Sequence, residues 1–351
     1  MSTKYGIWNN KGGVGKSTIT YHVASTFAAQ NPDKNVLVID LCPQANVSMM
    51  LLGGGVQGEN AVLNFCTEAV PRTVVGYLSE VLSGGERAPL PDPMNFVTRV
   101  RDVNPHMTEN LYLLSGDGNL EPMAPAITRA ADAPPLTPAS KPWRWVHEVF
   151  RRLIDNLENN DSWHVFVDTN PSFSIYTELA ISSCDKLIVP VNADDSSRVA
   201  TNAMFILLHG TNPPHPVYGS WTFAARAQQN GVSIPKVHLI VGNRLTSYDG
   251  VAGAFEALSA ATADTLFVNY RTHPGRFTQR NGSAGSVAAF RALFSVPLRD
   301  FNTAGVMSAH LGMRIDQMKQ SVYQAHGQNV HVKAEQLREA KTAINKVIAA
   351  L

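Results

Sequence analysis

Cysteine is scarce in this 351-residue sequence, and no long apolar run is present. The three cysteines, Cys42, Cys66 and Cys184, are far apart and form no C-x-x-C pair, which argues against a disulfide framework or a zinc site. No stretch of about 18 apolar residues predicts a transmembrane helix, and the N-terminus lacks the basic and apolar segments of a signal peptide. The sequence therefore favours a cytoplasmic protein with reduced thiols.

A large net charge is also missing from the chain as a whole. The formal net charge is +1, from 29 Lys and Arg against 28 Asp and Glu. Residues 271–351 nevertheless hold eleven Lys or Arg and four Asp or Glu, a net charge of +7, so the preceding 270 residues carry −6. A basic C-terminal region on an acidic body predicts attraction to a polyanion, either nucleic acid or an anionic membrane. An ordinary solvated surface is the alternative.

Short apolar runs alternate with helical patterns along the chain. Near-continuous apolarity is typical of strands that are covered on both faces. The alternation predicts an α/β fold, with a doubly wound, mostly parallel twisted sheet and helices on both faces. The candidate strands are YGIWNN (5–10), VLVID (36–40), LYLLS (111–115), HVFVD (164–168), LIVPV (187–191) and VHLIVGN (237–243).

Proline is concentrated in residues 84–142, which contain ten of the 21 prolines. Because proline lacks a backbone donor, we expect an irregular excursion around the strand at 111–115. Its apolar runs are too few for a second core, so residues 1–351 are predicted to form a single domain. A core-facing helix is predicted at 143–158, from the spacing of Trp145, Val149, Leu153 and Leu157.

The stretch NNKGGVGKST, residues 9–18, lies between a predicted strand and a predicted helix. Glycines let the backbone wrap closely around oxygen atoms, and N–H groups at a helix start attract anions. The stretch therefore predicts a phosphate-binding loop. Lys16 would reach the β and γ phosphates, the Ser17 hydroxyl would bind Mg²⁺, and Thr18 would lie near the α phosphate. The other loop residues in the predicted site are Gly12, Gly13, Val14 and Gly15.

The start of this loop departs from the common G-x-x-x-x-G-K-S/T pattern. Asn10 replaces the first glycine, and Lys11 precedes the glycine pair. The segment resembles the deviant Walker A motif K-G-G-x-G-K-S/T of the ParA/MinD family of P-loop ATPases. The resemblance implies that Lys11 crosses a dimer interface to the nucleotide of the other subunit, whereas Lys16 contacts its own nucleotide. A lysine that is merely exposed on the loop is the alternative.

Further segments follow in the order expected for this family, so the resemblance extends over most of the chain. Beyond residue 245 it is loose and limited to VPLRDFNTAGVMSAHLGMRI (296–315). The stronger matches are VLVIDLCPQANVS (36–48) with switch I, WHVFVDTNPSFS (163–174) with the Walker B segment, CDKLIVPVNAD (184–194) with the next strand and LIVGNR (239–244) with the base-binding strand.

The resemblance assigns roles to three residues of those segments. Asp168 closes an apolar strand and is expected to hold a water of the Mg²⁺ shell, with a strand-end cap or a surface acid as the alternative. Asn243 is expected to bond the adenine edge, and Arg244 to stack beside the base. For Asn243, a turn residue is the alternative. ATP and Mg²⁺ are therefore the implied ligands.

One residue of switch I breaks the family pattern D-x-D-P-Q. Cys42 stands at the second acid, which in the family lies near the attacking water. A thiol with an ordinary pKa of about 8.5 does not orient water as a carboxylate does. ATP hydrolysis is therefore expected to be weak.

Three interpretations of Cys42 stay open. In the first, Asp40 serves the Mg²⁺ shell while Lys11 and Lys16 supply electrostatic catalysis. In the second, the chain binds ATP and dimerises but hydrolyses it very slowly. In the third, Cys42 is a reactive thiol, because the nearby lysines create an electropositive setting.

The resemblance implies an ATP-dependent homodimer whose hydrolysis is stimulated by a partner protein. We predict a ParA-like ATPase that binds DNA non-specifically and positions a plasmid, chromosome or protein cargo with a ParB-like or adaptor partner. Nucleoid association follows if DNA binds. The candidate DNA-binding residues are Arg271, Arg276 and Arg280 in YRTHPGRFTQR, interleaved with Tyr270 and Phe277, and ordinary surface arginines are the alternative.

Three other functions share parts of this sequence pattern. A MinD-like membrane anchor would use the apolar side of a helix at 332–351, but such a stripe more often packs against its own domain, so membrane binding is not favoured. An ATP-locked adaptor with little hydrolysis is the rival that Cys42 favours. Iron–sulfur scaffold ATPases and the nitrogenase iron protein need paired cysteines, which Cys66 and Cys184 do not offer.

Overall fold

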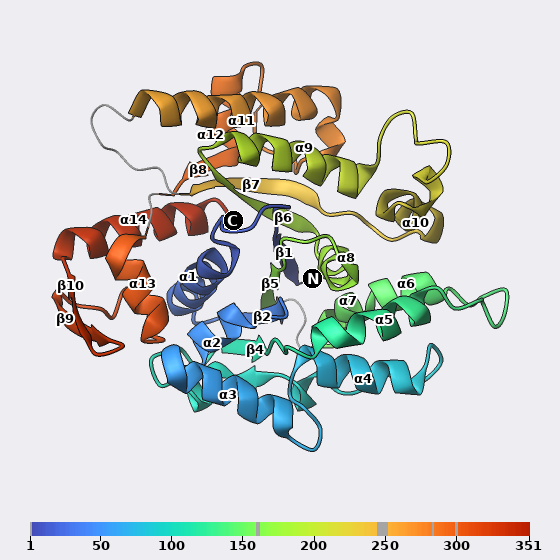
Figure 1. The fold of residues 1–351 in the computed structure, drawn as a ribbon, viewed down its shortest axis with the longest axis horizontal. Coiled ribbons are helices and arrows are strands. Elements are labelled where there is room, and N and C mark those ends of the chain that lie inside the picture. The colour runs from blue at the N-terminus through green and yellow to red at the C-terminus, as the bar shows by residue number, and fades with distance from the viewer. Residues whose placement is uncertain (1, 159–161, 244–251, 283, 299–300) are drawn as a thin grey trace.

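The computed structural model describes residues 2–158, 162–243, 252–282, 284–298 and 301–351. Its main sheet has eight strands in the order β3-β4-β2-β5-β1-β6-β7-β8, and every neighbouring pair is parallel except β3 with β4 (Figure 1). The predicted doubly wound, mostly parallel sheet is therefore confirmed. The strands are β1 Thr3–Ile7, β2 Asn35–Leu41, β3 Thr98–Arg99, β4 Leu111–Leu114, β5 Trp163–Thr169, β6 Lys186–Asn192, β7 Lys236–Asn243 and β8 Ser295–Pro297.

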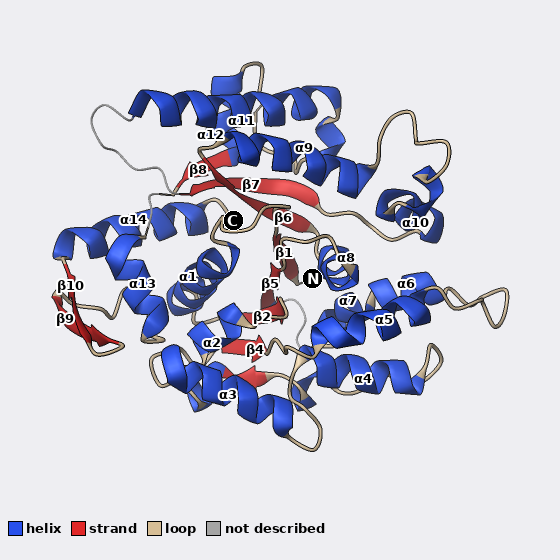
Figure 2. Ribbon diagram, viewed as in Figure 1, coloured by secondary structure: helices blue, strands red, loops and turns tan. Residues whose placement is uncertain are grey.

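Helices cover both faces of the sheet, so each central strand buries two sets of side chains (Figure 2). In β2, Leu37 and Ile39 belong to one hydrophobic core, whereas Val36 and Val38 belong to the other. The first core contains residues of α4 Val74–Gly84, α5 Leu120–Ala131, α6 Pro142–His147, α7 Val149–Asp155, α8 Ile175–Ser183, α9 Asp195–His209, α10 Phe223–Asn230, α11 Ala252–Thr272 and α12 Val287–Phe294. The second contains residues of α1 Lys16–Gln30, α2 Asn46–Leu51, α3 Gly55–Thr67, α13 Asn302–His310 and α14 Ala334–Ala349.

The proline-rich residues 84–142 are more regular than predicted. They include the edge strand β3, its neighbour β4 and the helix α5, and they place Phe96 and Ile127 in the first core. Pro122 falls in the first turn of α5, where the backbone N–H has no helical partner, so proline is tolerated there. The region therefore builds one edge of the sheet and is not an irregular excursion.

Smaller differences from the predicted elements concern their ends. The first strand stops at Ile7, because the phosphate loop begins directly after it. The helix predicted at 143–158 is present as α6 and α7, with a break at Glu148. The sequence reading missed the short strands β3 and β8 and the separate hairpin of β9 Ser321–Ala325 and β10 Gln328–Val332.

The last helix packs against its own domain. Leu337, Ile344 and Val347 on the apolar side of α14 are buried in the second core. Beyond the helix, the carbonyl oxygen of Leu351 accepts a hydrogen bond from the Tyr5 hydroxyl at 2.9 Å. The apolar side chains that a membrane anchor would need are therefore used inside the fold. In the part of the chain that the structure describes, we find no helix with the length and apolarity that a membrane span requires.

Candidate nucleotide-binding site

Residues 8–15 connect β1 to α1 at the carboxyl end of a strand that lies between β5 and β6. Gly13 and Gly15 have φ angles of 71° and 83°, which glycine adopts more readily than other residues. A Cβ atom at Gly12 or Gly13 would meet nothing within 4 Å, so the loop borders open space. The N-terminus of α1 has no acidic residue in its first turn. The loop and the helix dipole therefore favour an anion at this place.

The side chain of Lys16 folds back over the loop. Its Nζ donates to the carbonyl oxygen of Lys11 at 2.8 Å and to that of Asn9 at 3.3 Å. Burial lowers the pKa of Lys16 to about 8, against the opposing attraction of Asp168 and Cys42. An ammonium group held inside a loop of this shape is placed to bind phosphate oxygens.

Asp168 lies at the end of β5, opposite Ile7 of β1. Its Oδ2 accepts a hydrogen bond from Ser17 Oγ at 2.6 Å, and its Oδ1 accepts one from Thr20 Oγ1 at 3.1 Å. The structure thus brings together the two residues, 151 positions apart, that the sequence assigns to Mg²⁺.

Asp40 ends β2 next to Asp168, but its carboxylate has different partners. Oδ1 accepts from the backbone N–H of Cys42 at 3.1 Å. Oδ2 accepts from the N–H of Ser48 at 3.1 Å and from its hydroxyl at 2.7 Å. The Ser48 hydroxyl in turn accepts from the N–H of Gly116 at 2.9 Å. Asp40 therefore ties β2 to the first turns of α2, which is the predicted switch I region.

The two neighbouring acids, Asp40 and Asp168, are fully buried. Burial raises the pKa of both carboxyls, and the charge of Asp40 raises that of Asp168 further. A nearby cation would relieve this repulsion. Mg²⁺ is usually held by one or two carboxylates together with water and phosphate oxygens, so Ser17 and Asp168 fit it. The described residues contain no group of three or more His, Cys, Asp or Glu side chains that could hold a metal ion.

Cys42 is buried beside these acids, with 4% of its surface exposed. Burial raises the pKa of its thiol to about 12, and Asp40 and Asp168 act in the same direction, outweighing Lys16. Burial and the two neighbouring carboxylates therefore disfavour the third interpretation, a reactive thiol in an electropositive setting.

Lys11 points toward α9. Its Nζ forms an ion pair with Asp194 and donates to Ser197 Oγ at 3.4 Å. Asp194 also caps α9 by accepting from the Ser197 N–H at 2.7 Å. Burial tends to raise the pKa of Asp194, but hydrogen bonds from Lys11, Ser197 and Ser196 lower it to about 2. Sequence reasoning missed Asp194, although this acid lies two residues beyond an apolar strand and an acid closing such a strand is the signal that identified Asp168.

The remaining predicted nucleotide contacts lie at the end of β7. Asn243 is the last residue of that strand and pairs in register with Asn192 of β6. Because β6 follows β1 in the sheet, this end faces the same edge as the phosphate loop. Arg244 lies outside the described residues.

The three candidate DNA-binding arginines do not form one exposed cluster. Arg280 Nη2 donates to the carbonyl oxygen of His238 at 2.6 Å, so this guanidinium joins parts of the fold. The Arg276 guanidinium lies 6.0 Å from the centre of the Phe205 ring, and burial lowers the pKa of both arginines. Arg271, at the end of α11, is exposed. The interleaved Phe277 is buried in the first core.

A phosphate loop after the first strand, facing an acidic strand end in a mostly parallel sheet, defines a P-loop nucleotide-binding protein. The model of the AAA domain family AAA_31 matches residues 3–208, more than half of the chain. The chain belongs to this family. No curated protein matches it in sequence.

Solved structures with a similar fold share little sequence with this chain. Cyanothece McdA without nucleotide is 13% identical, with a TM-score of 0.60 over 100% of this chain and 99% of that one. The ATP complex of a single-residue variant of Cyanothece McdA is also 13% identical, with a TM-score of 0.59 over 99% and 96%. A Borrelia burgdorferi plasmid partition protein is 14% identical (TM-score 0.50, 100% of both chains), and pNOB8 ParA is 12% identical (TM-score 0.52, 99% and 100%). These similarities establish the shared fold.

Proposed function

We propose that this protein is a ParA-like positioning ATPase, which binds ATP with Mg²⁺, dimerises in the ATP state and hydrolyses ATP slowly. The observation that carries the proposal is the contact of Ser17 with Asp168 beside the buried ammonium of Lys16. Family membership and the fold shared with McdA, which was solved with ATP, support it. Non-specific DNA and a ParB-like or cargo-adaptor protein are the proposed partners.

The proposed roles follow from where each side chain lies. Lys16 and the loop N–H groups hold the phosphates, and Ser17 and Asp168 hold Mg²⁺. When bound, Mg²⁺ would neutralise negative charge on the phosphates. Asp40 acts as a positioning residue, because its three hydrogen bonds fix switch I next to the site. Asn243 and Arg244 remain the proposed contacts for the base.

Slow hydrolysis is proposed because Cys42 stands where a carboxylate would orient the attacking water. Changing Cys42→Asp is expected to raise the steady-state ATPase rate by about 10²-fold, the usual contribution of one positioned acid–base group. Phosphate release with saturating Mg–ATP measures this rate.

The matched control is Cys42→Ser, which keeps the size of the side chain without adding a carboxylate and should leave the rate low. Equal rates for Cys42→Asp and the wild type would refute the proposal that this position limits hydrolysis. An ATP-locked adaptor, the second candidate function, is favoured by the same residue. It predicts stable ATP-bound dimers with almost no turnover in the wild type.

Lys11 is proposed to reach the nucleotide of the second subunit. Its ion pair with Asp194 is partly exposed, with 18% and 40% of the two side chains accessible, and such pairs contribute little free energy. Little free energy is therefore needed for Lys11 to leave Asp194 and bind a phosphate of the nucleotide in the other subunit. We expect Lys11→Ala to abolish ATP-dependent dimerisation while ATP binding is retained.

Size-exclusion chromatography with light scattering tests this in ADP, ATP and a non-hydrolysable analogue. The control is Lys34→Ala, at a lysine outside the loop whose side chain is 40% accessible, and this variant should dimerise as the wild type does. A Lys11→Ala protein that still forms the ATP-dependent dimer would contradict the proposed role.

A further inference from the structure

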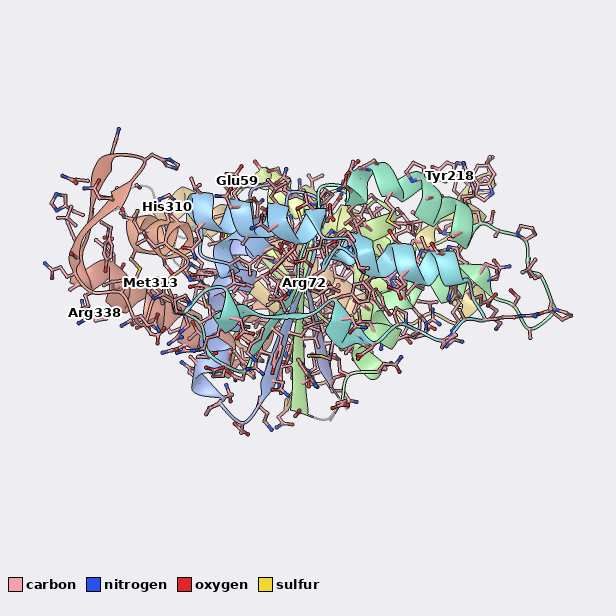
Figure 3. All side chains as sticks on the ribbon, turned by 90° about the horizontal axis from the view of Figure 1, so that it is seen from below. Glu59, Arg72, Tyr218, His310, Met313 and Arg338 are labelled. Atoms are coloured by element: carbon pink, nitrogen blue, oxygen red, sulfur yellow. The ribbon has the colours of Figure 1, made fainter. Side chains whose placement is uncertain are left out.

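The chain between α13 and α14 forms a separate two-stranded ribbon at one end of the molecule, and Arg338 lies at the same end (Figure 3). Its two-residue turn, His326-Gly327, has φ angles of 48° and 79°, the geometry of a tight hairpin. One face of the ribbon turns inward and includes the buried Val332. The other face is exposed and carries the cross-strand pairs Val322–His331 and Gln324–Asn329.

A shallow groove of about 520 Å³ adjoins the ribbon along α14. Its floor contains the buried side chains of Met318 and Leu337. Three cations and no carboxylate line it, and Lys341 Nζ donates to the carbonyl oxygen of Asp316 at 3.3 Å. The groove is lined by Met318, Lys319, Gln320, Ala334, Leu337, Arg338, Lys341, Thr342 and Asn345.

The positive charge of this groove is not neutralised by the ribbon beside it. Residues 317–334 contain Lys319 and Lys333 but no Asp or Glu. The carboxylate of Asp316 is already bound by the guanidinium of Arg314, at 3.0 and 3.1 Å. The acids of α14, Glu335 and Glu339, do not line the groove. The groove therefore offers cations and amide groups to a polyanion, and no carboxylate that lines it would repel the polyanion.

We propose that the ribbon and the groove form a binding surface for duplex nucleic acid. A five-residue strand is about 16 Å long, and a two-stranded ribbon fits a major groove about 12 Å wide. Gln324 Nε2 donates a hydrogen bond to Asn329 Oδ1 across the ribbon, and the remaining donors and acceptor of these exposed amides are suited to polar contacts with bases or sugars. Lys319, Arg338 and Lys341 would contact phosphates. A membrane surface fits less well, because Val322 is the single apolar side chain on the exposed face of the ribbon.

This inference rests on the proposed function, for which it names the surface that contacts DNA. It replaces the arginine cluster at 271–280, whose Arg276 and Arg280 are engaged within the fold. The test is fluorescence anisotropy of a labelled duplex of mixed sequence, with and without Mg–ATP, between about 50 and 200 mM salt. The groove variant combines Lys319→Ala, Arg338→Ala and Lys341→Ala, and the ribbon variant combines Gln324→Ala and Asn329→Ala.

The groove variant should bind at least about tenfold more weakly, and its slope of log affinity against log salt should fall by about 3, one for each lost cation. The ribbon variant should bind more weakly with an unchanged slope, because amides release no counterions. The charge-matched control combines Arg87→Ala, Arg129→Ala and Lys236→Ala at exposed positions elsewhere and should retain the wild-type affinity.

Any of three results would overturn the inference. The first is a groove variant with the wild-type DNA affinity and salt slope, and the second is an equal loss of DNA affinity in the charge-matched control or in Arg271→Ala. The third is a groove variant that loses binding to phosphatidylserine vesicles but keeps its DNA affinity. If the ribbon variant binds DNA with the wild-type affinity, the proposed contacts of Gln324 and Asn329 with DNA are wrong. Chromatography with ATP separates this inference from the proposed function. A groove variant that still dimerises with ATP but no longer binds DNA supports the proposed DNA-binding surface. A wild-type protein that binds DNA through the groove but does not dimerise with ATP contradicts the proposed ATP-dependent switch and leaves the DNA-binding surface standing.

Discussion

Replacing Lys16 with alanine is expected to reduce ATP hydrolysis by about 10²–10³-fold, the usual effect of removing one preorganised group that stabilises transition-state charge. Lys16 is 7% exposed and its ammonium group lies inside the phosphate loop, so water cannot readily take its place. Because the same group binds phosphate in the ground state, ATP affinity should fall as well. Calorimetric titration with Mg–ATP and a phosphate-release assay measure the two effects.

This result separates the two lysines of the loop. Lys16→Ala should lose ATP binding and, as a consequence, the dimer, whereas Lys11→Ala should lose the dimer alone. Lys34→Ala again serves as the control, since its side chain lies on the surface beyond the end of α1. Hydrolysis by Lys16→Ala at the wild-type rate would show that this loop is not the catalytic site.

The second large effect is expected on stability, from Gly54→Ala. Gly54 precedes α3 and has a φ angle of 68°, which is unfavourable for alanine. A Cβ atom there would lie 2.3 Å from the carbonyl oxygen of His310, which is backbone at the end of α13. Left-handed strain and overpacking together are expected to lower the free energy of unfolding by about 2–5 kcal/mol, as measured by urea denaturation.

A matched control is Gly275→Ala, because Gly275 is exposed and a Cβ atom there meets nothing within 4 Å. Its free energy of unfolding should stay within about 0.5 kcal/mol of the wild type. Equal stability of Gly54→Ala and the wild type would mean that the contact between the α2–α3 turn and α13 is looser than the structure shows. That contact joins the region behind switch I to the helix that leads into the ribbon.

Much of the fold follows from local sequence. Six apolar runs were predicted as strands, and all six are strands of the main sheet. Central parallel strands need apolar side chains on both faces, so their pattern is visible in one segment alone. The edge strands β3 and β8 span two and three residues, and runs this short carry no such pattern.

The candidate site divides in a similar way. Glycine spacing and the lysine, serine and threonine that follow are local features, so the loop is recognisable without a structure. Asp168 was predicted because an acid ends an apolar strand, and the structure places it within hydrogen-bond distance of Ser17. The partner of Lys11 was not predicted, because an acid just beyond a strand does not by itself show which lysine it pairs with, and Asp194 lies 183 residues from Lys11.

The sequence alone determined that this chain has a phosphate loop in an α/β sheet, since the steric freedom of glycine and the burial of apolar strands act over a few neighbouring residues. Tertiary structure decided how the charged groups are used. It buried Cys42 near two acids, engaged Arg280 with a backbone carbonyl, and left Arg338 exposed beside the ribbon. Electrostatic environment and burial depend on residues distant in the chain, so no local pattern specifies them.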